Sequence, residues 1–380
     1  MEGGKHEIPL PKKGLNALRM NMVKAYFRVL LLILCLTLAV SSPAFAITTV
    51  KGQYLNNAVF LSHNYVKYTS FVNLVPDLAD KMNTTYKVNY LFPNTGQLTS
   101  TGTIADASTE LAQVKAFLNA IKTFEEAHGV HFNVVAWLNA DSTTVDVTNT
   151  TVRSTIVNES KKLTSTTITG SYVSRATRAF DGVMLDLEPS GNDDTRYNAY
   201  KQLMIDIKNG IGSGKLTGVA AHQYGSGSVW SWSSTYYYYM ARNVDLLVGM
   251  TYDSGSTSGS AYQAWMQQQA TDILHAVSGQ TWSNDANHPA PTNGVKVFIG
   301  QPAYPSKPSA GHDAAFEAMN YGLSGLDAGI TALKNDTIDN SENWFNGAAV
   351  YLHTDGTGTD NYASWSTDWW QFGHYWLGSW

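Results

Sequence analysis

Short apolar runs alternate with longer segments of mixed polarity along most of the chain. Eight runs have the length and the β-branched or aromatic content of buried strands: "AVFLSH" (58–63), "KVNYLF" (87–92), "FNVVAWLN" (132–139), "FDGVMLDLE" (180–188), "LTGVAAHQY" (216–224), "VDLLVGMTYD" (244–253), "VKVFIGQPAY" (295–304) and "GAAVYLHTD" (347–355). Between them, residues 109–129 and 196–212 carry apolar residues at helical spacing. We expect the second of these helices to end at Gly210.

The runs are apolar on both alternating faces, which is typical of a parallel sheet covered by helices. Eight strand–helix units in about 330 residues predict an α/β fold, a (β/α)8 TIM barrel that forms a single domain over residues 47–380. The main alternative is an open, doubly wound sheet. No glycine-rich phosphate loop follows any of the runs, which favours the barrel.

Aromatic residues at the end of the chain, in residues 364–380, recur about once per helical turn. This spacing predicts a closing helix packed on the barrel, with a carbohydrate-binding patch as the alternative. The residues concerned are Trp365, Trp369, Phe372 and Trp376.

A second aromatic segment, residues 228–243, follows the fifth run. Trp230 and Trp232 are candidates for the wall of a sugar subsite. The tyrosines at 236–239 are expected to begin a helix that buries two of their rings.

The first 46 residues have the pattern of a secretory signal peptide. Six Lys and Arg residues precede the apolar run "VLLLILCLTLAV" (29–40), and "SSPAFA" then predicts cleavage after Ala46, with Met20 or Met22 as an alternative start. The alternative is an uncleaved membrane anchor, but the run is shorter than the roughly 20 residues of a spanning helix. We therefore expect a secreted or cell-envelope protein with no stable membrane contact after cleavage.

Removal of this segment changes the charge and the cysteine content. It leaves 19 Lys and Arg against 28 Asp and Glu, a net charge near −9, and it removes Cys35, the only cysteine. Nucleic acids and anionic membranes are therefore disfavoured as partners, and disulfides and thiolate chemistry are excluded. The few charges and many aromatic residues suit a neutral partner such as a polysaccharide or oligosaccharide.

Motifs for other chemistries are missing from the sequence. There is no H-E-x-x-H pair and no G-x-S-x-G elbow, so neither a metal site nor a serine hydrolase is predicted. We expect no cofactor, and we expect a monomer.

The active sites of β/α barrels lie at the C-terminal ends of the strands. The polar residues that close the apolar runs are therefore candidate site residues: His63, Asn64, Asn139, Asp141, Asp186, Glu188, His222, Gln223, Tyr252, Asp253, Gln301, Tyr304, His353 and Asp355. Trp137, just before Asn139, is a candidate stacking platform for a sugar, or else a ring buried in the core.

Two carboxylates close the fourth run. Met184, Asp186 and Glu188 share one face of a strand because side chains alternate, and the other face is apolar. Two carboxyl groups in one partly desolvated site cannot both ionise easily, so one pKa is expected to rise, which would provide a general acid for glycosidic cleavage. The alternative is that they cap the next helix or bind a surface arginine.

This segment resembles the fourth strand of the family 18 glycoside hydrolases, the chitinase-like β/α barrels, which carries D-G-x-D-x-D-x-E. Asp181, Gly182, Asp186 and Glu188 match that motif, and Met184 stands where the family usually has an aspartate.

Further likenesses occur at the later strands. "MTYD" (250–253) is similar to the family's M-x-Y-D, and "GQPAYP" (300–305) is similar to its G-x-P-x-Y. At the eighth run, Tyr351 replaces the usual tryptophan.

The resemblance implies substrate-assisted hydrolysis with retention of configuration. Glu188 would protonate the glycosidic oxygen while the substrate's own 2-acetamido oxygen attacks the anomeric carbon. Asp186 would orient that amide, and Tyr252 would hold its oxygen.

The expected substrate-binding residues surround these catalytic ones. Asp253 would bind near the scissile sugar, and Tyr351 would form the floor of its subsite. Trp137, Gln301 and Asp181 complete the candidate set, with Asp181 expected to be as much structural as functional.

Three functions follow as hypotheses. The first is a secreted glycoside hydrolase that cleaves β-linked N-acetylated glycans of the chitin or peptidoglycan type. The second is a chitinase-like lectin on the same barrel; the presence of Glu188 argues against it, and Met184 argues for it. The third is a hydrolase of non-acetylated glucans.

Overall fold

The computed structural model describes residues 53–378, except for residues 55, 305, 307–310, 337 and 352–366. The expected signal peptide and the candidates His353, Asp355 and Trp365 lie outside the described residues. Within them, no helix is long and apolar enough to cross a membrane. The residues from Thr49 onward form one compact unit.

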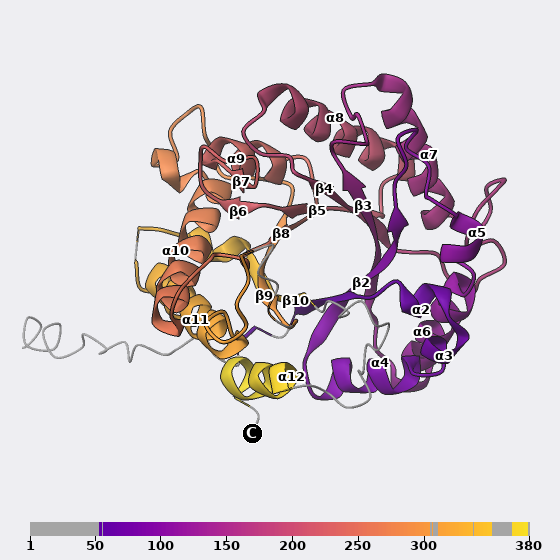
Figure 1. Ribbon diagram of the computed structural model, residues 1–380, viewed down its shortest axis with the longest axis horizontal. Helices are drawn as coiled ribbons and strands as arrows, with labels where there is room; N and C mark the ends of the chain where they lie inside the picture. The colour runs from indigo at the N-terminus through magenta and orange to yellow at the C-terminus, as the bar shows by residue number, and fades with distance from the viewer. Residues whose placement is uncertain are drawn as a thin grey trace, which may run out of the picture. The chain divides into compact units, whose positions relative to one another are not determined.

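Eight parallel strands close into a barrel in the order β1-β10-β9-β8-β5-β4-β3-β2 (Figure 1). Each of them falls on one of the eight predicted runs, and the pairing of the first with the last excludes the open sheet. The strands are β1 (Asn57–Leu61), β2 (Val88–Gln97), β3 (Asn133–Asp141), β4 (Gly182–Glu188), β5 (Leu216–Ala221), β8 (Leu246–Gly249), β9 (Lys296–Pro302) and β10 (Phe345–Tyr351). A separate two-stranded sheet joins β6 (Gln223–Tyr224) to β7 (Ser231–Trp232).

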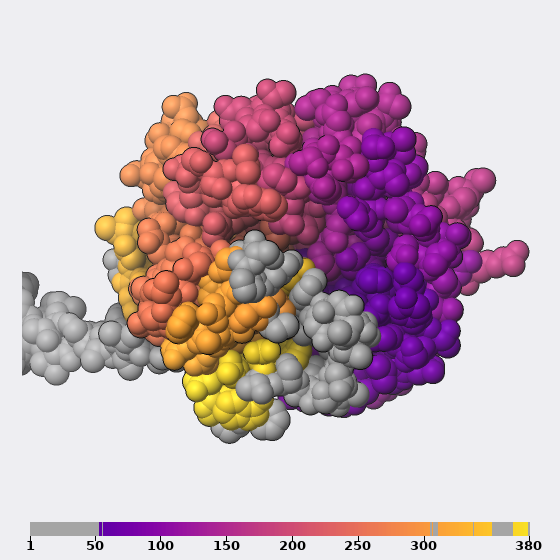
Figure 2. Space-filling view, in the orientation of Figure 1, coloured from indigo at the N-terminus to yellow at the C-terminus, as the bar shows by residue number. Residues whose placement is uncertain are grey.

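Helices surround the barrel, and the two halves of the chain lie on different sides of it, as the colours of Figure 2 show. The helices are α2 (Asn64–Lys67), α3 (Thr69–Val72), α4 (Val75–Thr84), α5 (Ala107–Glu110), α6 (Val114–His128), α7 (Thr150–Thr164), α8 (Asp194–Ile211), α9 (Ser234–Ala241), α10 (Gly259–Ser278), α11 (Met319–Asn335) and α12 (Thr367–Gln371). Short helical turns follow at η1 (Gln280–Trp282), η3 (Ser341–Trp344) and η5 (Phe372–Leu377).

Both predicted helical segments are mainly helical, although the first is interrupted at residues 111–113 between α5 and α6, and the expected stop of the second at Gly210 is wrong. Helix α8 continues to Ile211, and Gly210 lies inside it. A Cβ at Gly210 would come within 2.5 Å of a methyl of Val157, so the glycine allows α7 to pack closely against α8.

The strands bury both of their faces. On β4, Val183, Leu185 and Leu187 pack against the helices, whereas Met184 packs inside the barrel with rings such as Phe60. The predicted division of this strand into two faces is therefore confirmed. It follows that Asp186 and Glu188 extend the inner face toward the C-terminal end of the strand.

The aromatic end of the chain packs on the barrel, as predicted. Trp369, Phe372 and Trp376 are buried, and the indole N–H of Trp376 donates to Asn57 Oδ1 at 2.9 Å, at the start of β1.

Helix α9 also forms where a helix was expected, but it buries three tyrosine rings rather than two. Tyr236, Tyr237 and Tyr238 are buried, while Tyr239 is exposed.

Candidate active site

Asp186 lies at the C-terminal end of β4, opposite Asn139 of β3 in the strand register. The indole N–H of Trp137 donates to Asp186 Oδ2 at 3.2 Å. Trp137 is buried inside the barrel against Phe60 and Tyr351, so it is a core ring whose polar edge reaches the site rather than an open stacking platform.

Burial sets the protonation of Asp186. The side chain is only 7% exposed, and burial together with the negative charge of Glu188 raises its pKa well above 3.8, against the opposing hydrogen bond from Trp137. The pKa rise expected for one of the pair falls on Asp186, the deeper carboxyl, and not on the residue expected to be the general acid; Glu188 is the more open of the two. Asp186 Oδ1 and Asn139 Oδ1 are both buried and accept no hydrogen bond within the described part of the chain.

Glu188 is more open, with a side chain that is 40% exposed. Its Oε1 lies 3.8 Å from Nδ1 of His222, a buried histidine that follows β5. The backbone N–H of Ser190 donates to His222 Nε2 at 2.9 Å, so the neutral ring must carry its proton on Nδ1, which faces Glu188. Burial lowers the pKa of His222 to about 4, so the ring is neutral near pH 7.

One of the two candidate tryptophans after β5 borders this pair. Trp230 is 52% exposed, and its ring lies edge-on to His222 with 5.6 Å between the ring centroids. Trp232 is instead fully buried, and its indole N–H donates to Ser190 Oγ. The expectation that both line a subsite wall is therefore wrong for Trp232, whose ring packs in the core against Tyr197.

Three tyrosines form a wall beside the carboxylates. Tyr252 stacks on Tyr351 with 5.1 Å between ring centroids, and Tyr304 meets both rings edge-on. Burial raises the pKa of each, and the charges of nearby carboxylates, Asp186 among them, raise that of Tyr351 further. All three are therefore phenols at neutral pH and can donate hydrogen bonds.

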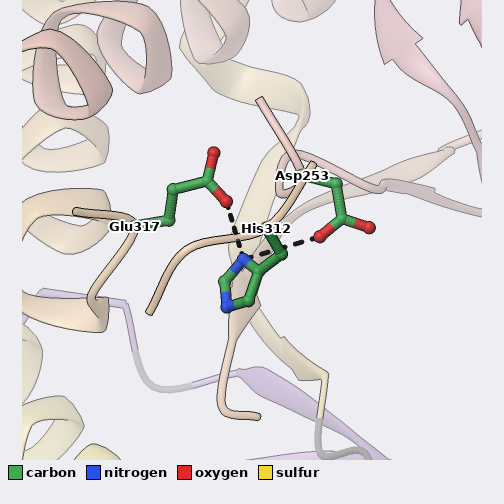
Figure 3. A group of neighbouring side chains, drawn as sticks. All are labelled: Asp253, His312 and Glu317. Atoms are coloured by element: carbon green, nitrogen blue, oxygen red, sulfur yellow. Dashed lines mark hydrogen bonds and ion pairs between the residues drawn. The ribbon is translucent and has the colours of Figure 1, made fainter. Parts of the chain in front are cut away.

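Asp253 follows Tyr252 and lies in a polar cluster formed with the segment after β9. The Tyr304 hydroxyl donates to Asp253 Oδ1. His312 Nδ1 lies 3.5 Å from the same oxygen, as Figure 3 shows. His312 Nδ1 also lies 2.6 Å from Glu317 Oε2. Asp253 thus joins the tyrosine wall to a buried histidine–glutamate pair.

The geometry of this cluster bears on metal binding. Asp253, His312 and Glu317 offer one ligand atom each within 4.8 Å of one another. Bonds of about 2.0–2.2 Å to a tetrahedral ion separate two ligand atoms by about 3.3 Å, which the 2.6 Å contact between His312 and Glu317 does not reach. The short contact is a hydrogen bond, so this arrangement does not fit an ion without rearrangement.

Asp181 does not join the site. It precedes β4, at the opposite end of the strand from Glu188, where its carboxylate accepts from Arg178 and from the backbone N–H of Val134. These contacts lie at the N-terminal ends of the strands, at the base of the barrel, so Asp181 is not part of the proposed site.

Gln301 does not join it either. Phe298 of β9 points into the barrel, so Gln301, an odd number of residues later, points to the helices. Its Nε2 lies 3.7 Å from the Met266 sulfur, beneath Gly322 of α11. We therefore also leave Gln301 out of the proposed site.

Two further residues of the site, His222 and Tyr304, were candidates only as strand-end residues, and two more, His312 and Glu317, were not predicted. His222 and Tyr304 close predicted strands, so their positions signalled them. His312 and Glu317 lie in a loop, where neither periodicity nor a known motif marks them.

Comparison with known proteins gives structural likenesses only. No protein-family model and no curated protein matches the chain. Similar solved structures include a chitinase from Bacteroides thetaiotaomicron, at 15% identity over 84% of this chain and 96% of that chain, with a TM-score of 0.48. The Bacillus cereus spore cortex-lytic enzyme SleL is 13% identical over 78% of this chain and 70% of its own, with a TM-score of 0.46.

A third similar structure is a glycoside hydrolase family 18 N-acetylglucosaminidase from Paenibacillus barengoltzii, at 11% identity over 66% of this chain and 69% of that chain, with a TM-score of 0.43. The chain spans about two thirds of the length of this enzyme and of SleL. These identities and TM-scores are low, so the geometry of the site has to support any functional proposal.

Proposed function

We propose that this protein is a secreted glycoside hydrolase that cleaves β-linked N-acetylated glycans of the chitin or peptidoglycan type, with retention of configuration. The observation that carries the proposal is the pair Asp186 and Glu188, two residues apart on one strand and in different environments. One is buried with a raised pKa, and the other is partly open at the C-terminal end of the strand. Unequal environments of this kind allow two carboxyl groups to take different catalytic roles.

Glu188 is the general acid. It donates its proton to the glycosidic oxygen as the bond from that oxygen to the anomeric carbon breaks. The carbonyl oxygen of the substrate's 2-acetamido group forms the new bond to this carbon, which gives an oxazolinium ion. Glu188, now a carboxylate, then takes a proton from the water that opens this ion, so both the acid and the configuration are restored.

Asp186 and Asn139 receive the acetamido side of the sugar. Their unpartnered buried oxygens are acceptors, and a bound amide N–H or hydroxyl group would satisfy them. The indole N–H of Trp137 donates a hydrogen bond to Asp186 and so fixes its carboxyl group. Met184 has no donor and cannot provide such a bond. An acceptor held in this way can orient the acetamido N–H while the amide oxygen attacks.

The tyrosines complete the sugar subsite. The hydroxyl of Tyr252 remains protonated and can donate to the acetamido oxygen as charge develops on the amide. Tyr351 offers a ring to the face of the sugar, and Asp253 holds a hydroxyl or amide at its edge.

A comparison of substrates tests this mechanism. We expect the protein to release reducing ends from chitin oligosaccharides or from bacterial cell-wall glycan, and not from cello-oligosaccharides of equal length, because only the former carry the attacking acetamido group. Equal rates on the two classes would overturn the substrate-assisted mechanism and favour a glucan hydrolase.

A carbohydrate-binding protein without turnover is the second candidate, and Met184 in the place of an aspartate favours it. Equilibrium binding to chitin oligosaccharides separates the two functions. Tight binding with no release of reducing ends over long incubation would support the second candidate.

Export is part of the proposal and has its own test. We expect the protein from the culture medium or cell envelope to begin at Ile47, after cleavage behind Ala46. N-terminal sequencing of that fraction checks this, and a protein that retains residues 29–40 would instead indicate a membrane anchor.

A further inference from the structure

Asp253 adopts a backbone conformation that needs outside support. Its φ of +60° lies in the left-handed region, which residues other than glycine seldom occupy. Such a conformation persists where surrounding contacts determine it. The contacts that do so here come from the segment after β9, about 60 residues further along the chain.

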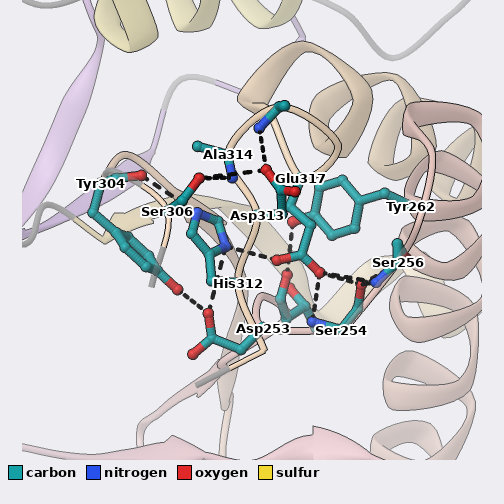
Figure 4. A network of polar contacts seen from close by, with 12 residues as sticks. Asp253, Ser254, Ser256, Tyr262, Tyr304, Ser306, His312, Asp313, Ala314 and Glu317 are labelled. Atoms are coloured by element: carbon teal, nitrogen blue, oxygen red, sulfur yellow. Dashed lines mark hydrogen bonds and ion pairs between the residues drawn. The ribbon is translucent and has the colours of Figure 1, made fainter. Parts of the chain in front are cut away.

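Glu317 holds the backbone on the far side of Asp253. The buried Glu317 Oε1 accepts from the backbone N–H of Ser254 at 2.7 Å, from the Ser254 hydroxyl and from the backbone N–H of Ser256 at 3.4 Å (Figure 4). Burial acts to raise the pKa of Glu317, but hydrogen bonds from His312 and Ser254 outweigh it and lower the pKa. The side chain is therefore a carboxylate that fixes residues 254–256.

His312 lies between the two carboxylates with its side chain 1% exposed. Its Nδ1 faces Glu317 Oε2 at 2.6 Å and Asp253 Oδ1 at 3.5 Å, and its Nε2 faces the Tyr304 carbonyl oxygen at 3.3 Å. Both ring nitrogens thus face oxygen acceptors. Nδ1, which lies between the two carboxylates, is therefore the donor of the ring toward them.

We propose that His312 and Glu317 are positioning residues for Asp253: Nδ1 of His312 orients its carboxylate, and Glu317 locks the backbone that follows it. His312 and the Tyr304 hydroxyl approach the same oxygen, Oδ1, and Figure 3 shows the other carboxylate oxygen pointing away from His312. The orientation of Asp253 toward the sugar is thereby set before substrate arrives. This inference rests on the proposed function, in which Asp253 binds the scissile sugar.

The first test is kinetic and uses the full mature chain. His312→Leu removes the donor, whereas His312→Asn keeps an N–H near the position of Nδ1. We expect His312→Leu to raise KM for chitin oligosaccharides about tenfold with a smaller change in kcat, and His312→Asn to recover most of the loss. In a background of Asp253→Ala, His312→Leu should have no further effect on KM, because the group that it positions is gone.

A matched control separates positioning from loss of stability. His275 pairs with the buried carboxylate of Asp339 in the same way, but in the last turns of α10, whose end lies at the base of the barrel. His275→Leu should lower the melting temperature without changing KM. Equal KM effects of His275→Leu and His312→Leu, or additive effects of His312→Leu and Asp253→Ala, would overturn the inference.

A second test needs no substrate. With 15N-labelled histidine, NMR should show a hydrogen-bonded proton on Nδ1 of His312, and Glu317→Gln should weaken that hydrogen bond. A His312 ring without a proton on Nδ1 would overturn the inference whatever the activity. A hydrogen-bonded Nδ1 proton in a protein that neither binds nor cleaves N-acetylated oligosaccharides would overturn the proposed function and leave the contact between His312 and Asp253 supported.

Discussion

Two carboxylates only two residues apart take on different characters because of their depth in the barrel. Asp186 lies beside Trp137 at the top of the packed interior, while Glu188 emerges at the C-terminal end of the strand next to His222. The two-residue period of a strand was enough to predict that they share a face. The hydrogen bond from Trp137 was not predictable, because it depends on the register between β3 and β4, which no local pattern encodes.

Trp137 gives the first prediction. Trp137→Phe keeps a large ring in the barrel but removes the N–H that fixes Asp186, so kcat should fall about tenfold, the scale of one hydrogen bond. Trp376→Phe is the matched control, since it removes an indole donor to Asn57 at the start of β1. If steady-state kinetics showed the same loss of kcat for both variants, the role of Trp137 would be general packing.

His222 gives the second prediction, on stability against pH. Its pKa in the folded protein is about 4, below the ordinary 6.5, so the unfolded chain takes up the proton first as pH falls. The free energy of unfolding therefore falls by roughly 3 kcal/mol, through His222 alone, as the pH decreases from 6.5 to 4. Above pH 6.5 this contribution to stability is complete, and below pH 4 it is lost.

His222→Gln removes this titration and can still accept the Ser190 N–H. Urea unfolding at a series of pH values should show a shallower loss of unfolding free energy for the variant between pH 6.5 and 4. Parallel curves for the two proteins would contradict the buried, neutral state of His222.

At the scale of elements, strands and helices were predictable because each has its own period, and the eight runs became the eight barrel strands. The contacts between loops were not predictable. Glu317 binds Ser254 across 63 residues of sequence, and nothing near either residue marks that pairing. The prediction that α8 ends at Gly210 failed for the same reason. A glycine often ends a helix, but Gly210 lies within α8 and allows α7 to pack closely against it.

The segment between β6 and β7 carries the third prediction. Trp230 is exposed beside His222, and His222 faces Glu188. Trp230 is therefore placed to stack on the sugar of the leaving group, whose glycosidic oxygen receives the proton. Trp230→Ala should raise KM for long chitin oligosaccharides about tenfold, with little change for substrates too short to reach it. Trp370→Ala, at a comparably exposed tryptophan of α12, is the control; an equal effect there would remove Trp230 from the subsite.

At the scale of the whole molecule, closure of the barrel brings together residues that are far apart in the chain. Trp137, Asp186 and Tyr351 lie on three different strands and Tyr252 follows a fourth, and only the barrel places them around one centre. The rule that barrel sites lie at strand ends was therefore sufficient to find most of the site from sequence. It failed for Gln301, because a position near a strand end does not by itself say which face the side chain takes.

The central claim is that Glu188 is the acid that cleaves a β-linked N-acetylated glycan. The most direct test measures reducing ends released from chitin oligosaccharides and bacterial cell-wall glycan by the mature protein and by Glu188→Gln, with binding of both proteins measured in parallel. We predict turnover by the wild type, a loss of at least about a hundredfold in the variant, and binding by both. Undiminished turnover by Glu188→Gln would contradict the assignment of the acid, and binding without turnover by either protein would contradict the enzyme itself.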